Sequence, residues 1–262
     1  MSIVFSAIVP HPPLLIPSIG KENAQQLKST DQAFKKLEEE LYASKPDTIL
    51  IISPHGVVQS NAFTLNLSPE FSGNLETFGD FSTKLNFKGD VGLAYRIREN
   101  LETKAPLQLI SEKKLDYGSL IPLYLLTKNM PQVKIIPLYY SGLDLQAHFK
   151  FGQVLKRELL YNKNRVAIIA SGDLSHRLTK EAPAGYSPKG QKFDQKLIEL
   201  ITKNQSEEIL NLNHKLIMEA SECGLKSIII LLGILDGMKH ETQKLSYEAP
   251  FGVGYLTMNF VI

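Results

Sequence analysis

The sequence predicts an α/β fold, a three-layer α/β/α sandwich with a mostly parallel central sheet. Short apolar segments alternate along the chain with longer segments of helical periodicity, which is typical of parallel strands joined by helices. Thr48–Ser53 is apolar at every position between its two ends, as in strands covered by helices on both faces. No fixed-period repeat, low-complexity segment or Ser/Gly linker interrupts this order, so we expect a single domain over residues 1–262.

The alternation assigns an element to most of the chain. The expected strands cover residues 3–9, 48–53, 62–67, 107–110, 133–138, 165–170 and 252–261. The expected helices cover residues 21–44, 91–101, 120–128, 143–160, 189–203, 206–210, 214–220 and 222–237. Residues 70–88 are rich in Phe, Gly and Asn, and we expect them to form an excursion such as a hairpin or lid.

Composition and charge exclude several classes of protein. The chain has 29 Lys and Arg against 27 Asp and Glu, which argues against nucleic acid as the main partner. Apolar residues make up 43% of the chain, too many for a disordered protein. The single cysteine, Cys223, excludes a disulfide scaffold. No apolar run approaches the ~20 residues that a membrane-spanning helix needs. The apolar N-terminal segment has no basic leader, so we do not expect a signal peptide. We therefore expect a cytoplasmic protein that does not enter the membrane.

Two histidines follow predicted buried strands in matching positions. His11 comes after the strand at 3–9 in Val-Pro-His-Pro-Pro, and His55 comes after the strand at 48–53 in Ser-Pro-His-Gly. Ligands of open α/β sheets bind at the carboxyl ends of the strands, and the prolines stiffen the turns that hold the imidazoles. The pair therefore predicts a metal site, whereas either histidine alone could simply end a strand in a proline-rich loop.

A third expected strand end carries residues 170–177, Ala-Ser-Gly-Asp-Leu-Ser-His-Arg. Asp173 and His176 could point into the same crevice, where His176 would transfer protons and the carboxylate would orient it. The alternative is that Asp173 caps a helix and His176 lies in its first turn. Three histidines at strand ends together favour a functional site.

The fourth candidate element is residues 220–224, Ala-Ser-Glu-Cys-Gly. We expect Ser221 to cap the following helix and Glu222 to lie in its first turn, where the helix dipole favours an acid. Alternatively, Glu222 completes a two-His, one-carboxylate set, which leaves open positions on Fe(II) for substrate and O₂. Cys223 could be a soft ligand for copper or zinc, or a small core residue.

Together, these elements resemble the class III extradiol dioxygenase family. Within it, the chain is similar to the branch called AmmeMemoRadiSam system protein B, of which Memo is a relative. The matching segments span nearly the whole chain in order, at residues 9–14, 52–56, 116–122, 171–176, 222–224 and 249–255. The resemblance implies one α/β/α domain with a metal in the crevice at the strand ends.

The resemblance also implies a metal and its ligands. It makes His11 and His55 the histidine ligands and Glu222 the carboxylate ligand, with Fe(II) as the expected metal. In Memo relatives a cysteine matches Cys223, and a copper or iron site has been proposed there. The third ligand is therefore left open between Glu222 and Cys223, and copper or zinc is the alternative to iron.

Two further matched segments carry residues that are expected to transfer protons. The resemblance makes His176 the acid–base histidine, with Asp173 beside it, and it includes Asp116 in the site. Ring-cleaving members of the family commonly carry a histidine directly after this aspartate, whereas this chain has Tyr117. Because tyrosine is a poor base near neutral pH, ring cleavage is expected to be impaired if this position has to move a proton.

Three functions are consistent with these expectations. The first is a dioxygenase-like oxidoreductase that acts on a catechol-type aromatic substrate and O₂ with Fe(II). The second is a Memo-like metal-binding protein that works with an AMMECR-type or radical-SAM partner, or in redox signalling. The third is a metal-dependent hydrolase that uses the same ligands to activate water. A homo-oligomer is compatible with each of them.

Overall fold

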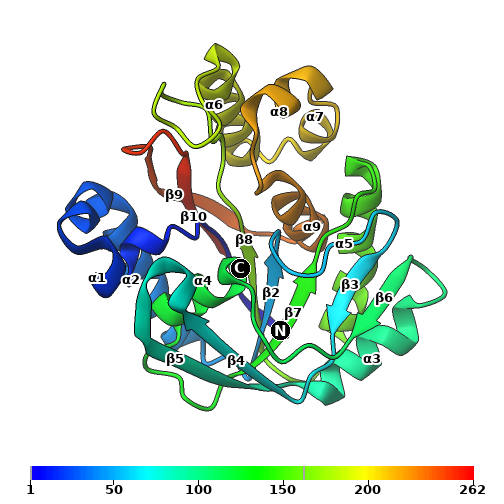
Figure 1. The fold of residues 1–262 in the computed structure, drawn as a ribbon. Coiled ribbons are helices and arrows are strands. Elements are labelled where there is room, and N and C mark those ends of the chain that lie inside the picture. The colour runs from blue at the N-terminus through cyan, green and yellow to red at the C-terminus, as the bar shows by residue number, and fades with distance from the viewer. Residues whose placement is uncertain (1, 162) are drawn as a thin grey trace.

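The computed structural model describes residues 2–161 and 163–262, and it confirms the predicted α/β fold (Figure 1). Within these residues, ten strands form one sheet, with eight of them in the order β4-β5-β7-β2-β8-β1-β10-β9, and β3 lying against β6 and β7. The four central strands run parallel to one another; they are β7 (Lys134–Tyr139), β2 (Thr48–Ser53), β8 (Val166–Ser171) and β1 (Ile3–Val9). The outer strands are β3 (Phe63–Asn66), β4 (Glu70–Leu75), β5 (Asp80–Gly89), β6 (Leu107–Ile110), β9 (Glu241–Glu248) and β10 (Tyr255–Val261).

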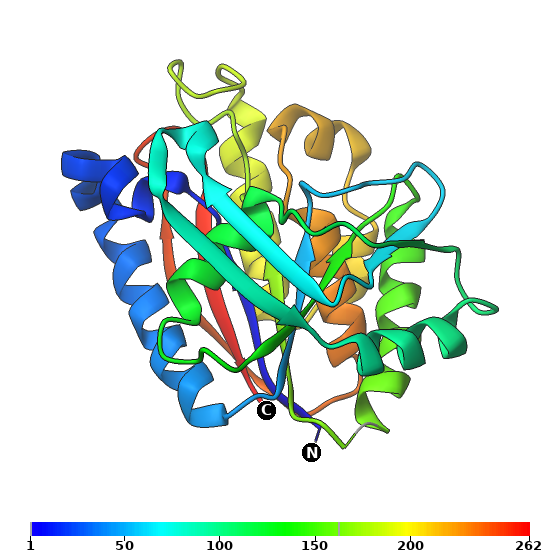
Figure 2. The ribbon, with the colours of Figure 1, turned by 60° about the horizontal axis from the view of Figure 1, so that its bottom comes forward.

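Helices cover both faces of the sheet, which gives three layers (Figures 1 and 2). The apolar residues of one face pack against α2 (Lys28–Ser44) and α4 (Tyr117–Leu126). The other face packs mainly against α3 (Val91–Leu101), α5 (Leu145–Leu160), α6 (Pro188–Thr202) and α9 (Leu225–Leu235). Because β2 and β8 are buried at every residue, their side chains belong to both cores, as their continuous apolar sequences predict. The remaining short elements are α1 (Pro17–Gly20), α7 (Ser206–Leu210), α8 (His214–Ala220) and three 3₁₀ helices, η1 (Pro13–Leu15), η2 (Lys21–Leu27) and η3 (Glu76–Phe78).

Two expected helix starts lie at or next to residues with a positive φ, and both are wrong. The helix expected at 21–44 begins only at Lys28, because Lys21 has a left-handed φ of 48° and the next residues form a 3₁₀ helix. Ser221 does not cap the apolar helix. It has φ 51° and ψ 47° and ends α8, so α9 begins at Leu225 with Gly224 as its N-cap.

The sequence prediction also missed an edge strand. β9 pairs with β10 in antiparallel register, and six of its eight residues are polar because it lies at the edge of the sheet and is largely accessible to solvent. It therefore lacks the apolar run that identified the other strands. The helix expected at 120–128 is present but begins at Tyr117.

The expected excursion at 70–88 is a β-hairpin. β4 and β5 pair in antiparallel register, and Gly79 turns the chain with a φ of 85°. β4 packs closely on α4, because a Cβ atom on Gly73 would lie 2.4 Å from Leu120 Cδ1. Over residues 2–161 and 163–262, none of the helices combines the length and the apolar character that crossing a lipid bilayer requires.

Candidate metal centre

The two proline-flanked histidines lie together at the carboxyl edge of the sheet. Strands β1 and β2 flank β8 and run parallel to it, so the segments that follow all three strands meet at one edge. A single proline separates His11 from β1 and His55 from β2. These short, stiff turns place both imidazoles over the same point.

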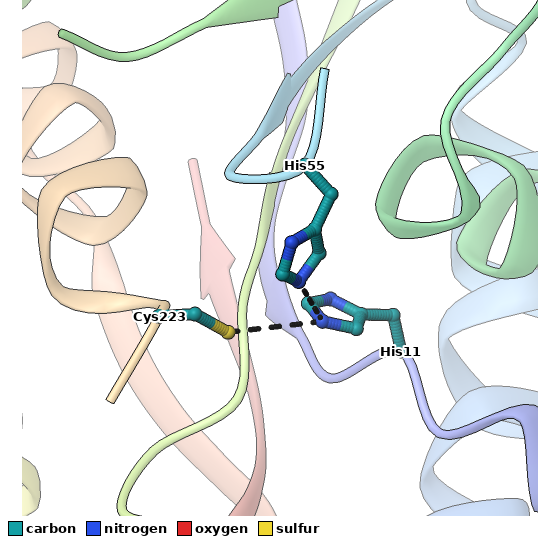
Figure 3. Close-up of side chains that lie close together, drawn as sticks. All are labelled: His11, His55 and Cys223. Carbon is teal, nitrogen blue, oxygen red and sulfur yellow. Dashed lines mark hydrogen bonds between the residues drawn. The ribbon is translucent and has the colours of Figure 1, made fainter. Parts of the chain in front are cut away.

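Cys223 completes this group from the turn before α9 (Figure 3). The Nε2 atoms of His11 and His55 are 3.0 Å apart, and Cys223 Sγ is 3.7 Å from His11 Nε2. The three ligand atoms all lie within 4.8 Å of one another. Residues far apart in the sequence thus present two nitrogens and a sulfur to one position.

Hydrogen bonds fix which nitrogen of His11 faces this position. Ser171 Oγ donates its only proton to the carbonyl of Gly118, at 2.6 Å. The same hydroxyl lies 2.9 Å from His11 Nδ1, so it accepts a hydrogen bond from Nδ1–H. Neutral His11 therefore carries its proton on Nδ1 and directs the lone pair of Nε2 at His55 and Cys223.

Burial keeps both histidines neutral. Desolvation lowers the pKa of His11 to about 3. Desolvation also lowers the pKa of His55 to about 4, and the nearby His11 lowers it further. Both rings are therefore uncharged at neutral pH, which is the form that binds metals.

The spacing of the donors fits a metal ion. Imidazole nitrogens bind metals such as zinc at 2.0–2.1 Å, so two nitrogens on one ion would be about 2.9 Å apart at a right angle and about 3.3 Å apart at the tetrahedral angle. The separation of the two Nε2 atoms, 3.0 Å, lies within this range. A set of two imidazoles and one thiol suits zinc, copper or iron, whereas magnesium and calcium prefer oxygen ligands.

Asp173 and His176 lie beside the three donors. Asp173 Oδ1 accepts a hydrogen bond from the backbone N–H of His11 at 3.0 Å, and its Oδ2 is 3.6 Å from His11 Nε2. Asp173, His176 and Cys223 form a second group whose ligand atoms lie within 4.8 Å of one another. The alternative that Asp173 caps a helix is wrong, since the next helix begins at Pro188.

Glu222 and Cys223 are adjacent in sequence but have different surroundings. The Glu222 carboxylate accepts a hydrogen bond from the backbone N–H of Leu225 at 2.6 Å, at the start of α9, and desolvation raises its pKa to about 7. Cys223 Sγ instead accepts a hydrogen bond from the backbone N–H of Asp173 at 3.3 Å, and burial raises the pKa of the thiol. The structure thus brings Cys223 to the two histidines and directs Glu222 to the helix terminus.

Two glycines allow the loop after β8 to touch the turn before α9. A Cβ atom on Gly172 would lie 2.2 Å from Gly224 Cα. The close approach of the two backbones is what brings Cys223 next to Asp173. Gly172 has no side chain, and this permits the contact.

Asp116 supports His55 from the start of α4. Its carboxylate accepts hydrogen bonds from the backbone and hydroxyl of Ser119 at 3.0 and 2.7 Å, which cap the helix. It also accepts a hydrogen bond from Ser53 Oγ, and Ser53 Oγ in turn accepts one from the backbone N–H of His55. Asp116 therefore orients the histidine turn through Ser53.

Tyr117 covers His55. The two rings stack with centroids 4.3 Å apart and an angle of 19° between their planes, and Tyr117 Oη is 2.9 Å from His55 Nε2. Burial raises the pKa of Tyr117, so the hydroxyl stays protonated. The side chain can donate a hydrogen bond at the site but does not act as a base there.

A known family model matches nearly the whole chain. The model, described as the catalytic LigB subunit of aromatic ring-opening dioxygenase, matches residues 6–258. The chain belongs to the LigB family. The matched range includes every candidate residue described above.

Two curated proteins and one solved structure are similar to this chain over most of its length. Protein CA_C1420 of Clostridium acetobutylicum is 32% identical over 268 residues, which cover 98% of this chain and 57% of that protein, so the chain spans a little over half of its length. The 3,4-dihydroxyphenylacetate 2,3-dioxygenase of Escherichia coli is 26% identical over 224 residues, or 78% of this chain and 79% of the enzyme. The crystal structure of uncharacterized protein JW3007 from Escherichia coli K12 has the same fold, with a TM-score of 0.72, 18% identity and coverage of 98% and 99% of the two chains.

Sequence reasoning missed several residues that hold the candidate site in place. Ser53 and Ser171 are the last residues of β2 and β8, and both hydrogen-bond to the histidine turns. A serine that ends an otherwise apolar strand was the available signal. Asp194 of α6 gave no such signal, yet its buried carboxylate accepts a hydrogen bond from the backbone N–H of Ser175, between Asp173 and His176.

Proposed function

We propose that this LigB-family chain is a dioxygenase-like oxidoreductase that binds Fe(II) and acts on a catechol-type aromatic ring with O₂. The observation that carries the proposal is the pair of neutral imidazoles whose Nε2 atoms lie 3.0 Å apart, with the lone pair of His11 fixed toward the shared position. His11 and His55 would hold the metal, and either Cys223 or Glu222 would be the third ligand. Fe(II) in such a site supplies open coordination positions for substrate oxygens and for O₂.

The surrounding residues would handle the protons. His176 Nδ1 is buried and has no hydrogen-bond partner among the described residues, so it is available to take a hydroxyl proton from the substrate and return it later. Asp173 would keep His11 in place through the His11 backbone N–H. Tyr117 would donate a hydrogen bond without accepting a proton, so we expect slow turnover relative to enzymes that have a histidine there.

A second candidate function is supported by Cys223. Its sulfur lies 3.7 Å from His11 Nε2, while the Glu222 carboxylate bonds to Leu225. A set of two imidazoles and a thiolate favours copper or zinc over Fe(II). This candidate is a Memo-like metal-binding protein of the AmmeMemoRadiSam type, which would act with an AMMECR-type or radical-SAM partner.

Oxygen uptake by the reconstituted protein tests the proposal. The protein is loaded with Fe(II) without O₂ and then mixed with oxygenated buffer and a panel of catechols that includes 3,4-dihydroxyphenylacetate. We expect one O₂ to be consumed per ring opened and a yellow product to appear.

Three variants test the assigned residues. The activity should be lost in His55→Ala and retained in His240→Ala. It should be reduced by about 10²- to 10⁴-fold in His176→Gln, the usual contribution of general acid–base catalysis. Uptake no greater than that of His55→Ala with every catechol would contradict the proposal, and tight binding of copper or zinc would then favour the second candidate.

A further inference from the structure

The tip of the β4–β5 hairpin reaches the candidate site. Phe78, in the 3₁₀ turn between the two strands, meets Tyr117 edge to face, with ring centroids 5.5 Å apart and an angle of 75°. Tyr117 in turn stacks on His55. The three rings form a continuous row from the hairpin tip to the metal-binding histidine.

Asp80 fixes the tip to the segment that follows His11. Ser18 Oγ donates a hydrogen bond to Asp80 Oδ2 at 2.6 Å, and the backbone and hydroxyl groups of Ser82 and Thr83 bond to the same carboxylate. Asp80 is only 3% exposed. These hydrogen bonds, that of Ser18 first, lower the pKa of Asp80, so the carboxylate stays charged. Figure 2 shows the hairpin tip close to α1, the helix that carries Ser18.

The body of the hairpin is fixed to the segment that leads into Tyr117. The backbone of Ser72 in β4 donates to the carbonyl of Lys113 at 2.8 Å and accepts from the N–H of Leu115 at 2.9 Å. Leu115 is two residues before Tyr117 in the sequence. The hairpin is therefore attached, near its tip and along β4, to segments that carry site residues.

We propose that Phe78 is a positioning residue that holds the Tyr117 ring over His55, and that the two aromatic rings form the wall on which a planar aromatic substrate packs. The second half of this proposal rests on the proposed function. Aromatic rings prefer offset-stacked and edge-to-face contacts with other rings. The hairpin would thus select planar substrates without touching the metal ligands.

Nuclear magnetic resonance of the histidine rings tests the positioning role without any metal or substrate. The chain has six histidines, so the imidazole C–H spectrum is sparse, and the His55 signal is assigned with His55→Ala. In Phe78→Ala we expect the His55 signal to shift, because the stacked Tyr117 ring moves, while the signal of the buried His148 stays in place and reports an intact fold. Phe78→Tyr, which keeps the ring, should restore the wild-type position.

Phe81→Ala is the matched control. Phe81 lies on the same hairpin but is 73% exposed. We expect its removal to leave the His55 signal unchanged. A His55 signal in Phe78→Ala that coincides with the wild-type signal would overturn the positioning role.

Binding of 4-nitrocatechol to the Fe(II)-loaded protein tests the wall. Phe78→Ala should weaken this binding roughly 3- to 10-fold, the contribution of one aromatic pair, and Phe81→Ala should not. Unchanged 4-nitrocatechol binding in Phe78→Ala would contradict the proposed aromatic wall, even if the His55 signal shifts. If the wild-type protein binds no 4-nitrocatechol, the proposed function and the wall both fail, and the histidine spectrum still decides whether Phe78 positions Tyr117.

Discussion

The hydroxyl proton of Ser171 determines which ring nitrogen of His11 carries a proton. Ser171 donates to the carbonyl of Gly118, so it can only accept from His11 Nδ1, and the Nε2 lone pair must face His55. In the absence of a metal, a proton on His55 Nε2 can bridge the two rings at their 3.0 Å separation. A metal ion in that position would replace this proton, which requires His55 to be protonated on Nδ1 instead.

Zinc affinity tests whether Cys223 or Glu222 is the third metal ligand. Removal of a residue that only hydrogen-bonds to a metal ligand typically weakens metal affinity by about 10- to 100-fold. If Cys223 is itself the third ligand, Cys223→Ser should weaken Zn²⁺ affinity by more than this. Glu222→Gln should leave Zn²⁺ affinity nearly unchanged, because its side-chain oxygen can still accept the hydrogen bond of Leu225. Competition with a chromophoric chelator measures both affinities. Loss of affinity in Glu222→Gln together with retention in Cys223→Ser would instead make Glu222 the ligand.

The positions of some of these side chains could be predicted from the sequence, and those of others could not. His11 and His55 were predictable as a pair because a strand end fixes where the next residues lie. Which of Glu222 and Cys223 turns toward the site was not predictable, because it depends on the left-handed conformation of Ser221, which follows α8. The contact between Phe78 and Tyr117 joins two separate segments, and no local pattern marks it.

Among the elements, α5 and α9 make an unusually close contact that supports Cys223. A Cβ atom on Gly152 would lie 2.2 Å from the carbonyl oxygen of Ile230, and one on Gly233 would lie 2.2 Å from that of Phe149. The two helices thus touch through their backbones. Since α9 begins just after Cys223, this contact fixes the helix that carries the site turn.

Substitution of Gly233 tests this contact. Gly233→Ala should lower the free energy of unfolding by about 1–3 kcal/mol, the usual cost of overpacking. Gly92 in α3 is the control, because the nearest atom to its Cβ position is 3.7 Å away, at Asp90. Gly92→Ala should leave stability unchanged or raise it by up to about 1 kcal/mol, because alanine loses less conformational entropy in a helix. Urea unfolding followed by circular dichroism measures both, and equal effects of the two variants would contradict the contact.

Element prediction succeeded where burial dominated and failed at exposed or irregular positions. The buried strands β2 and β8 were evident from their apolar runs, and an excursion such as a hairpin or lid at residues 70–88 was expected from its Phe, Gly and Asn content. The edge strand β9 was missed because its polar residues face solvent. The start of α2 was wrong because neither the positive φ of Lys21 nor the 3₁₀ helix over Lys21–Leu27 is apparent from helical periodicity.

For the whole molecule, alternating strands and helices were enough to predict three layers but not the order of the strands. The chain begins near the centre of the sheet, with β1 between β8 and β10, and then adds strands to both sides. This order brings the ends of β1, β2 and β8 together, and the site depends on it. The solved structure of JW3007 shares this fold, and ligands of open α/β sheets bind at the carboxyl edge, where these strand ends meet.

Metal content tests most directly the claim that His11 and His55 hold one metal ion. The protein is loaded with Fe(II) without O₂, freed of excess metal and analysed for iron, beside a His11→Ala/His55→Ala double variant and His240→Ala. We predict about one iron per chain in the wild-type protein and in His240→Ala, and none in the double variant, because a single two-histidine site holds the ion. Iron retained by the double variant at the wild-type level would contradict the account, since the metal would then lie elsewhere in the molecule.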